Sequence, residues 1–160
     1  MRIVGRMALV FVVAFASLGA MSQQHADQSA SDNEIRIGNV MPYSGPLSEF
    51  GAIGTAEAAY FDMINARGGI NGRKIRFITR DDNSDPASAL ELTRGLVEKD
   101  DVHLMFGSFG TPGNLATRWY LNEKKIPQLF VASGDEELSQ AKTFPWTMGW
   151  PPSYRAEGRI

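Results

Sequence analysis

Residues 102–134 have the sequence VHLMFGSFGTPGNLATRWYLNEKKIPQLFVASG, and this stretch decides the fold. Val102–Phe106 is a short apolar run, typical of a strand that is covered on both faces. Pro112–Lys125 has helical spacing, and Gln128–Ala132 is a second apolar run. The helix is expected to place three of its larger residues near one face: Leu115, Trp119 and Tyr120. Strand, helix and strand in this order predict a parallel unit with a right-handed crossover.

The same alternation of strand and helix recurs towards the amino terminus. Glu34–Met41 alternates apolar and polar residues, which predicts a strand that ends before Pro42. Ala52–Ala66 has apolar residues at spacings of three and four, which predicts a helix that ends at Gly68-Gly69. Its buried stripe is expected to consist of Ala52, Ala56, Ala59, Tyr60, Met63 and Ile64.

Further elements complete the predicted sheet. Arg73–Arg80 is the second strand, and Asp85-Pro86 then places an N-cap residue before a proline at the first helical position. The helix that follows is expected to bury Ala89, Leu90, Thr93, Leu96 and Val97. Phe144–Met148 is a candidate fifth strand, and Ser153 is predicted to cap a new helix. The alternation predicts an α/β fold, a parallel sheet with helices on both faces.

The first 26 residues have the features of an export signal. Two arginines precede an uncharged apolar run, Met7–Leu18, and small and polar residues follow. The run is shorter than the roughly 20 residues that a membrane span needs. We predict a signal peptide over 1–26, cleaved near Ala20 or Ala26, and a flexible leader over 27–33. An uncleaved membrane anchor is the alternative.

Composition narrows the classes of function. The 160 residues allow about one domain, with 43% hydrophobic and 21% charged residues and a net charge of −2. A nearly neutral chain is not typical of a nucleic-acid-binding protein. Without cysteine, disulfide scaffolds, thiolate zinc sites and cysteine nucleophiles are excluded. Two histidines leave little for a histidine-rich metal site, and we expect no metal and no cofactor.

Candidate binding residues lie in the loops after the predicted strands. Ligands of open parallel sheets bind beyond the carboxyl ends of the strands. Those loops are rich in hydroxyls, glycines and aromatic residues, and the helix starts that follow can hold an anion such as a carboxylate. Thr111 precedes Pro112, where an N-cap would point at a ligand. It either contacts a ligand or only caps its own helix, and both roles are compatible.

Other motifs carry less chemistry. Gly107–Gly113 does not have the glycine spacing of a dinucleotide-binding loop, and the phosphate-loop and nucleophile-elbow motifs are absent from the sequence. Asp81 and Asp82 suit either a metal pair or a polar turn, and the turn is favoured because adjacent strand residues point to opposite faces. His103 is expected to be structural. Four aromatic residues near a proline-rich break are expected in the core rather than lining a cleft: Phe144, Trp146, Trp150 and Tyr154.

Six motifs, taken in order, resemble a known family. They are IRIGNVMPYSGPLSEFG, INARGGINGRKI, DDNSDP, LVEKDDVHLMFGS, KKIPQLFVASG and FPWTMGWPPSYRAEGRI, and together they extend over residues 35–160. This order resembles the type I periplasmic solute-binding proteins of the leucine/isoleucine/valine-binding family, which serve ABC importers. The last motif looks like a branch that takes hydrophobic or aromatic acids as well as amino acids.

The resemblance implies a set of ligand-binding residues and no catalytic ones. In that family one lobe grips a carboxylate with a hydroxyl and backbone N–H groups after strands three and four. By motif, this grip falls on Phe109, Gly110, Thr111, Ala132, Ser133 and Gly134, and the aromatic residue after strand one falls on Phe50. Tyrosine is usual at position 50 and threonine is common at position 134, so two hydroxyls of the pattern are missing from this sequence.

The resemblance also implies a role and a domain organisation. The expected protein is a periplasmic solute-binding component that delivers a small carboxylate to ABC permease subunits of the inner membrane. Residues 34–148 would form its first lobe, and 149–160 would begin the crossing to a second lobe that the 160 residues do not contain. Two alternatives are a ligand-sensing lobe of a receptor or regulator, and a metal-dependent enzyme that uses Asp81 and Asp82.

Overall fold

The computed structural model describes residues 33–160, so the predicted signal peptide and residues 27–32 of the predicted leader lie outside the described residues. Five strands form one sheet in the order β2-β1-β3-β4-β5. They are β1 (Glu34–Met41), β2 (Lys74–Asp81), β3 (Leu104–Phe106), β4 (Gln128–Val131) and β5 (Thr147–Gly149). The pairs β1–β3, β3–β4 and β4–β5 are parallel. The predicted parallel α/β fold is confirmed.

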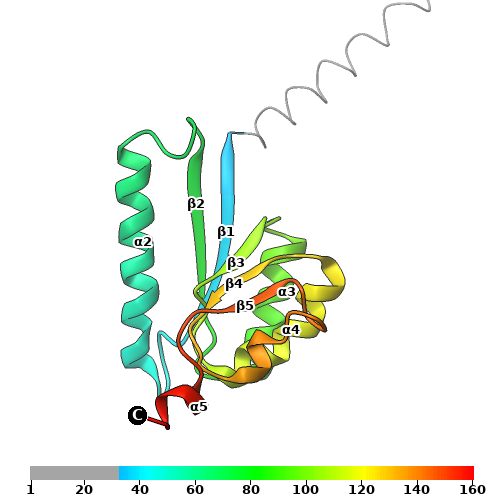
Figure 1. Ribbon diagram of the computed structural model, residues 1–160. Coiled ribbons are helices and arrows are strands. Elements are labelled where there is room, and N and C mark those ends of the chain that lie inside the picture. The colour runs from blue at the N-terminus through cyan, green and yellow to red at the C-terminus, as the bar shows by residue number, and fades with distance from the viewer. Residues whose placement is uncertain (1–32) are drawn as a thin grey trace, which may run out of the picture. The chain divides into compact units, whose positions relative to one another are not determined.

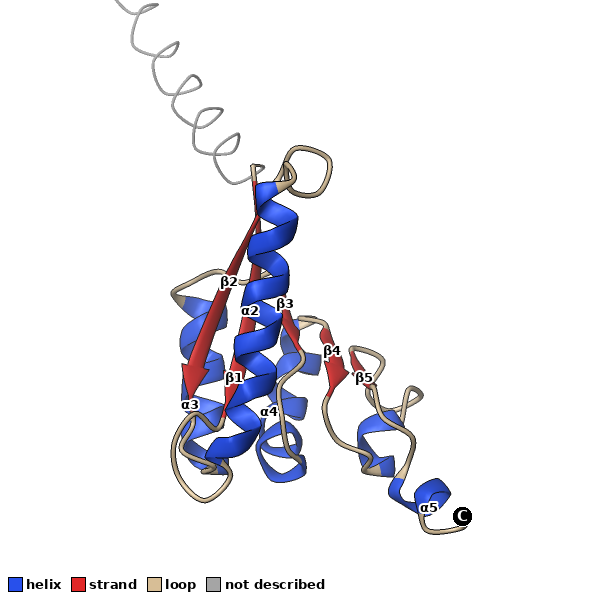
Figure 2. Ribbon diagram, turned by 90° about the vertical axis from the view of Figure 1, so that its left-hand side faces the viewer, coloured by secondary structure: helices blue, strands red, loops and turns tan. Residues whose placement is uncertain are grey.

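Helices cover both faces of the sheet, as predicted. Helix α2 (Gly51–Ala66) lies on one face, whereas α3 (Pro86–Glu98) and α4 (Thr111–Lys124) lie together on the other (Figure 1, Figure 2). Asp85 caps α3 as predicted, because its side chain accepts a hydrogen bond of 2.8 Å from the Ser88 N–H. Three short helices complete the fold: η1 (Ser48–Phe50), η2 (Glu136–Ser139) and α5 (Tyr154–Glu157).

The larger apolar core lies between the sheet and the pair α3–α4. Alternate residues of each strand point to opposite faces, so β1 sends Val40 to this core and Ile37 to the other. Helix α3 buries Ala89, Thr93 and Leu96 as predicted, with Leu96 fully buried. The other two predicted positions, Leu90 and Val97, are partly buried against the same core. The buried residues of this core are Val40, Ile78, Ala89, Leu96, Val102, Met105, Tyr120 and Leu121.

The core under α2 corrects the stripe predicted for that helix. Tyr60 is 57% exposed and Met63 is also exposed, whereas Gly51, Gly54 and Phe61 are the buried residues. A Cβ at Gly54 would lie 2.3 Å from the Tyr43 hydroxyl, so glycine is what allows the helix to approach the sheet. The pattern misled because Ala52, Ala56 and Ala59 share a face that is exposed, so a stripe of alanines at helical spacing does not mark the buried side here.

Helix α4 also departs from prediction. Trp119 is 67% exposed whereas Tyr120 is buried, so the two do not lie near one face, and the inner side of the helix is largely polar. Its buried residues are Asn114, Thr117, Arg118, Tyr120 and Leu121. The polar members are accommodated because hydrogen bonds to neighbouring segments satisfy them.

The fifth strand begins later than expected. The Thr147 N–H donates to the Phe144 carbonyl at 3.1 Å, and the Phe144 N–H donates to the Gln140 carbonyl at 2.9 Å. These turns occupy the start of the predicted strand. The extended segment therefore runs over Thr147–Gly149 instead of Phe144–Met148.

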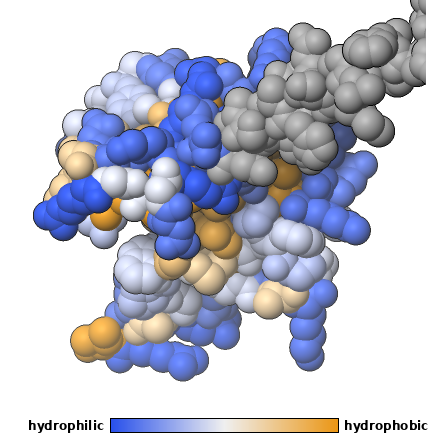
Figure 3. Space-filling view, turned by 90° about the horizontal axis from the view of Figure 1, so that it is seen from above, coloured by the Kyte–Doolittle hydropathy of each residue, from blue (hydrophilic) through white to orange (hydrophobic). Residues whose placement is uncertain are grey.

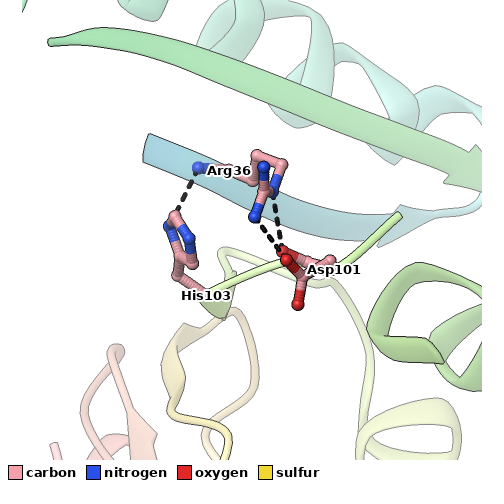
Figure 4. Close-up of polar contacts among 3 residues, drawn as sticks. All are labelled: Arg36, Asp101 and His103. Atoms are coloured by element: carbon pink, nitrogen blue, oxygen red, sulfur yellow. Dashed lines mark hydrogen bonds and ion pairs between the residues drawn. The ribbon is translucent and has the colours of Figure 1, made fainter. Parts of the chain in front are cut away.

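Polar contacts tie the start of β1 to the segment before β3. The Arg36 side chain donates from Nε to the Asp101 carbonyl at 2.8 Å and also pairs with the Asp101 carboxylate (Figure 4). The Arg36 N–H donates to Nδ1 of His103 at 3.1 Å. His103 thus makes a contact that joins two strands, which agrees with the structural role expected for it.

The surface seen from above, at the end where β1 begins, is mostly hydrophilic, with a few hydrophobic residues near the centre and the lower left of the view (Figure 3). The loops that carry the candidate site lie at the opposite ends of the strands (Figure 1). Within residues 33–160, no helix is long and apolar enough to cross a membrane.

Truncation of Leu96 tests the larger core. We expect Leu96→Ala to lower the free energy of unfolding by about 3 kcal/mol, because a fully buried side chain leaves a cavity. Urea denaturation followed by circular dichroism measures the change. Leu47→Ala is the matched control, since Leu47 is 41% exposed and its loss is expected to cost less than about 1 kcal/mol. Equal losses in the two variants would contradict this core.

Candidate functional site

The loops after β3 and β4 lie side by side. The Gly110 N–H donates to the Ala132 carbonyl at 3.2 Å, and the Ala132 N–H donates to the Ser108 carbonyl at 3.0 Å. A parallel bridge between Phe109 and Ala132 extends the strand pairing into both loops. The residues that the sequence assigns to these two loops are therefore brought together at the carboxyl end of the sheet.

Two hydroxyls meet between the loops. Oγ1 of Thr111 and Oγ of Ser133 are 2.6 Å apart, and Ser133 is buried. Gly110, with φ at +91°, is the N-cap of α4, and Thr111 is already the first helical residue. The interpretation of Thr111 as an N-cap is therefore wrong. The left-handed turn at Gly110 starts the helix one residue early, and the Thr111 hydroxyl pairs with Ser133 instead.

Asn114 holds the loop after β3 in place. Its Nδ2 donates to the Ser108 carbonyl at 3.0 Å and to the Gly110 carbonyl at 2.6 Å, and its Oδ1 accepts from Nε2 of Gln128 at 2.9 Å. All of these side-chain atoms are buried or partly buried. Sequence reasoning missed this pair, although a glutamine in the short apolar strand QLFV was a signal.

An apolar cavity opens beside the two loops. Its volume is about 580 Å³. Phe50 and Phe109 stack at its wall with ring centroids 4.3 Å apart and planes 14° from parallel. Phe50 thereby joins the predicted site through Phe109. The lining consists of Phe50, Ile53, Glu57, Phe106, Gly107, Phe109, Phe130, Ala132, Trp150 and Pro151.

The aromatic residues of the last segment serve different purposes. Phe144 is buried, as expected, and the guanidinium of Arg118 lies 3.8 Å from its ring centroid. Trp150 contradicts the prediction of a core residue, because it is exposed and lines the cavity, 5.3 Å from Phe130 between centroids. Trp146 and Tyr154 are exposed as well. Around the proline-rich break the aromatic side chains are exposed, and the spacing of apolar residues in the sequence does not predict this exposure.

Glu57 places one ionisable group in the apolar lining. Burial raises the pKa of Glu57 to about 7. Its Oε2 accepts from Nδ2 of Asn39 at 3.1 Å, and that nitrogen also donates to the Phe106 carbonyl at 2.8 Å. Gly107 lies against the carboxyl group, with φ at +64°, and a Cβ there would lie 1.8 Å from Oε1 of Glu57. Sequence reasoning missed Glu57, which lies among alanines on α2.

Asp81 and Asp82 fill the turn roles that the sequence favours. Asp81 is exposed and accepts from the Ser44 hydroxyl at 2.6 Å, and this hydrogen bond lowers the pKa of Asp81. Asp82 is buried, which raises its pKa, and it accepts from the Ser84 N–H at 2.9 Å. The described part of the chain contains no cluster of three or more His, Cys, Asp or Glu residues able to hold a metal ion.

Comparison with known proteins places these features in a family. The family model described as periplasmic binding protein matches residues 34–159. The Leu/Ile/Val-binding protein homolog 7 of Brucella abortus is 36% identical over 126 residues, which cover 77% of this chain and 30% of that protein. An amino acid binding protein of Pseudomonas aeruginosa is 28% identical over 110 residues, covering 67% of this chain and 29% of that protein.

A solved structure gives the same result at the level of the fold. The substrate-binding periplasmic protein from Ralstonia solanacearum superposes with a TM-score of 0.71 at 26% identity, over 76% of this chain and 35% of that one. The chain thus spans about 30% of the length of the curated relatives that it matches. The family model covers nearly all described residues, and the superposition supports the same α/β fold. This chain belongs to the type I periplasmic binding proteins of the Leu/Ile/Val-binding family.

Proposed function

We propose that this chain forms the first lobe of an exported solute-binding component of an ABC importer, and that its ligand is an amino acid or a related carboxylate, hydrophobic and aromatic acids included. The observation that carries the proposal is the pairing of Thr111 and Ser133 at the start of α4, beside an apolar cavity. The site therefore offers one polar end and one apolar wall to a small molecule.

The polar end suits an anionic group. The Thr111 and Ser133 hydroxyls can donate to carboxylate oxygens once they turn from each other. Both lie at the amino terminus of the 14-residue helix α4, where backbone N–H groups and the helix dipole favour negative charge. Hydrogen bonds to a charged acceptor are stronger than those between neutral groups. Carboxylate binding is the chemistry that this end supports.

The apolar wall suits a hydrophobic body. A volume of about 580 Å³ lies in the range of small-molecule sites, and aromatic rings make up much of the lining. Phe50, which lacks the hydroxyl of the usual tyrosine, keeps this wall apolar on the side of α2. An aliphatic or aromatic side chain would lose its hydration against these rings, which supports a hydrophobic acid over a polar one.

Transport follows from family membership rather than from the site itself. Solute-binding proteins of this family serve ABC importers, so the partners we propose are permease subunits and the compartment is the periplasm. Thr111 and Ser133 are proposed to bind the solute and not to attack it. Within residues 33–160, the two hydroxyls bond to each other, to the Tyr154 phenol and to the Asp135 N–H, and none of these groups is a basic side chain that could activate a nucleophile.

Removal of the paired hydroxyls tests the carboxylate site. We expect the full-length protein carrying Thr111→Val and Ser133→Ala to bind its carboxylate at least about 10-fold more weakly, because hydrogen bonds to a charged group contribute about 1.5–3 kcal/mol each. Isothermal titration calorimetry with isoleucine, phenylalanine and benzoate measures this. Thr55→Val is the control, since the Thr55 hydroxyl bonds within α2. Absence of binding to every carboxylate of a broad panel would refute the proposed function.

Glu57 predicts a pH dependence of stability. Its pKa rises from 4.5 to about 7 on folding, so between these values the folded state retains a proton that the unfolded state has released. Stability therefore falls as pH rises through this window. We expect the stability of Glu57→Gln to depend less on pH than that of the wild type. At pH 8 the variant should have a free energy of unfolding higher by on the order of 1 kcal/mol, a value kept small because the carboxyl is partly solvated.

Urea denaturation at pH 5 and pH 8 measures the effect of Glu57→Gln. Glu91→Gln is the matched control, because Glu91 is exposed on α3 and far from the cavity lining. Parallel pH profiles for the wild type and Glu57→Gln would show that the carboxyl is not held in its neutral form.

A further inference from the structure

The segment after β5 folds back onto the hydroxyl pair. The Tyr154 N–H donates to the Gly134 carbonyl at 2.8 Å, which anchors the start of α5 to the loop after β4. The phenolic oxygen of Tyr154 lies 3.4 Å from Oγ of Ser133, which in turn lies 2.6 Å from Oγ1 of Thr111. Three hydroxyls from three separate segments therefore meet at the start of α4.

Gly134 makes room for the Tyr154 ring. A Cβ at position 134 would lie 2.7 Å from Cδ1 and 2.9 Å from Cε1 of that ring, and 2.6 Å from the Pro152 carbonyl oxygen. Gly134 is not among the described glycines with positive φ, so its backbone does not itself demand glycine. The residue is small because the Pro152 carbonyl oxygen and the tyrosine ring together occupy the adjacent space.

Tyr154 is not placed as a core residue. Its side chain is 55% exposed, and its ring is absent from the two apolar cores. Hydrogen bonds with Ser133 and Thr111 lower the pKa of the phenol, which makes it a better donor to an anion. A side chain with this exposure and these partners is available to a ligand that reaches the hydroxyl pair.

We propose that Tyr154 is a specificity-determining residue of the carboxylate site, and that its phenolic hydroxyl supplies a third contact beside those of Thr111 and Ser133. The small Gly134 leaves room for the ring that carries this hydroxyl. The carboxylate is then held by Thr111, Ser133 and Tyr154 together. This inference rests on the proposed function, because it assigns a further residue to the same site.

Removal of the phenolic hydroxyl tests the donor role. The full-length protein is titrated by calorimetry with isoleucine, phenylalanine and benzoate, as wild type and as Tyr154→Phe. For the ligand that the wild type binds most tightly, we expect Tyr154→Phe to lower the affinity by about 10-fold, because one hydrogen bond to the carboxylate is lost. The melting temperature should change little, because the aromatic ring is retained. Tyr60→Phe is the matched control, because Tyr60 is 57% exposed and lies on α2, which contributes none of the three hydroxyls.

A larger side chain at position 134 tests the steric part. We expect Gly134→Thr to lower both affinity and melting temperature, because the new side chain meets the Pro152 carbonyl oxygen and the Tyr154 ring. We expect Tyr154→Ala to weaken binding at least as much as Tyr154→Phe, because it removes both the hydroxyl and the ring.

Failures of the two proposals are distinguishable. A wild-type protein that binds no member of the panel overturns the proposed function and this inference with it. A wild type that binds, with Tyr154→Phe within two-fold of it, overturns the inference alone. A Gly134→Thr variant with the affinity and melting temperature of the wild type contradicts the steric part while leaving the carboxylate site intact.

Discussion

The amide of Asn114 is the contact on which the site depends. Its side chain donates to the carbonyls of Ser108 and Gly110 and accepts from Nε2 of Gln128. Oε1 of Gln128 in turn accepts from the Thr147 hydroxyl at 3.0 Å. The chain of hydrogen bonds passes from the loop after β3 through α4 and β4 to β5. A buried polar group without a hydrogen bond destabilises a protein by more than a typical hydrogen bond stabilises it. The loss of one member of this network would therefore leave its neighbours without partners at a high cost in free energy. This network ties the loop after β3 to α4 and β4.

Periodicity predicts this fold well where side chains differ strongly around an element. Helix α3 has its large apolar residues on one side and buries them, and Leu96 is fully enclosed. Helix α2 has most of its alanines on the exposed side, and its orientation depends on where Gly54 allows close approach and where Phe61 fits. On α4, Trp119 is exposed, and polar residues such as Thr117 occupy the buried side, where Gln128 donates to the Thr117 hydroxyl. Gln128 belongs to β4, so the sequence of α4 alone does not indicate that its polar residues are buried.

The candidate site shows the same division. Strand order alone requires the loops after β3 and β4 to be neighbours, so motif position was enough to bring Thr111 near Ser133. The cavity needs information that no single segment holds, because Glu57 comes from α2, Phe130 from β4 and Trp150 from the segment after β5. Position along the chain locates the polar end of such a site, and tertiary packing creates the apolar wall.

The two ends of the site differ in how they tolerate change. Hydrogen bonds have narrow geometry, so the hydroxyl end is held by a buried network and by glycine at two positions, Gly110 with φ at +91° and Gly134 against the Tyr154 ring. Apolar contacts are less directional, so we expect a change at the exposed Trp150 to disturb the hydroxyl end less than a change at Phe50, which stacks on Phe109 of the loop after β3. A fixed polar anchor with an adjustable apolar wall is a physical route by which one fold can accept acids of different side chains.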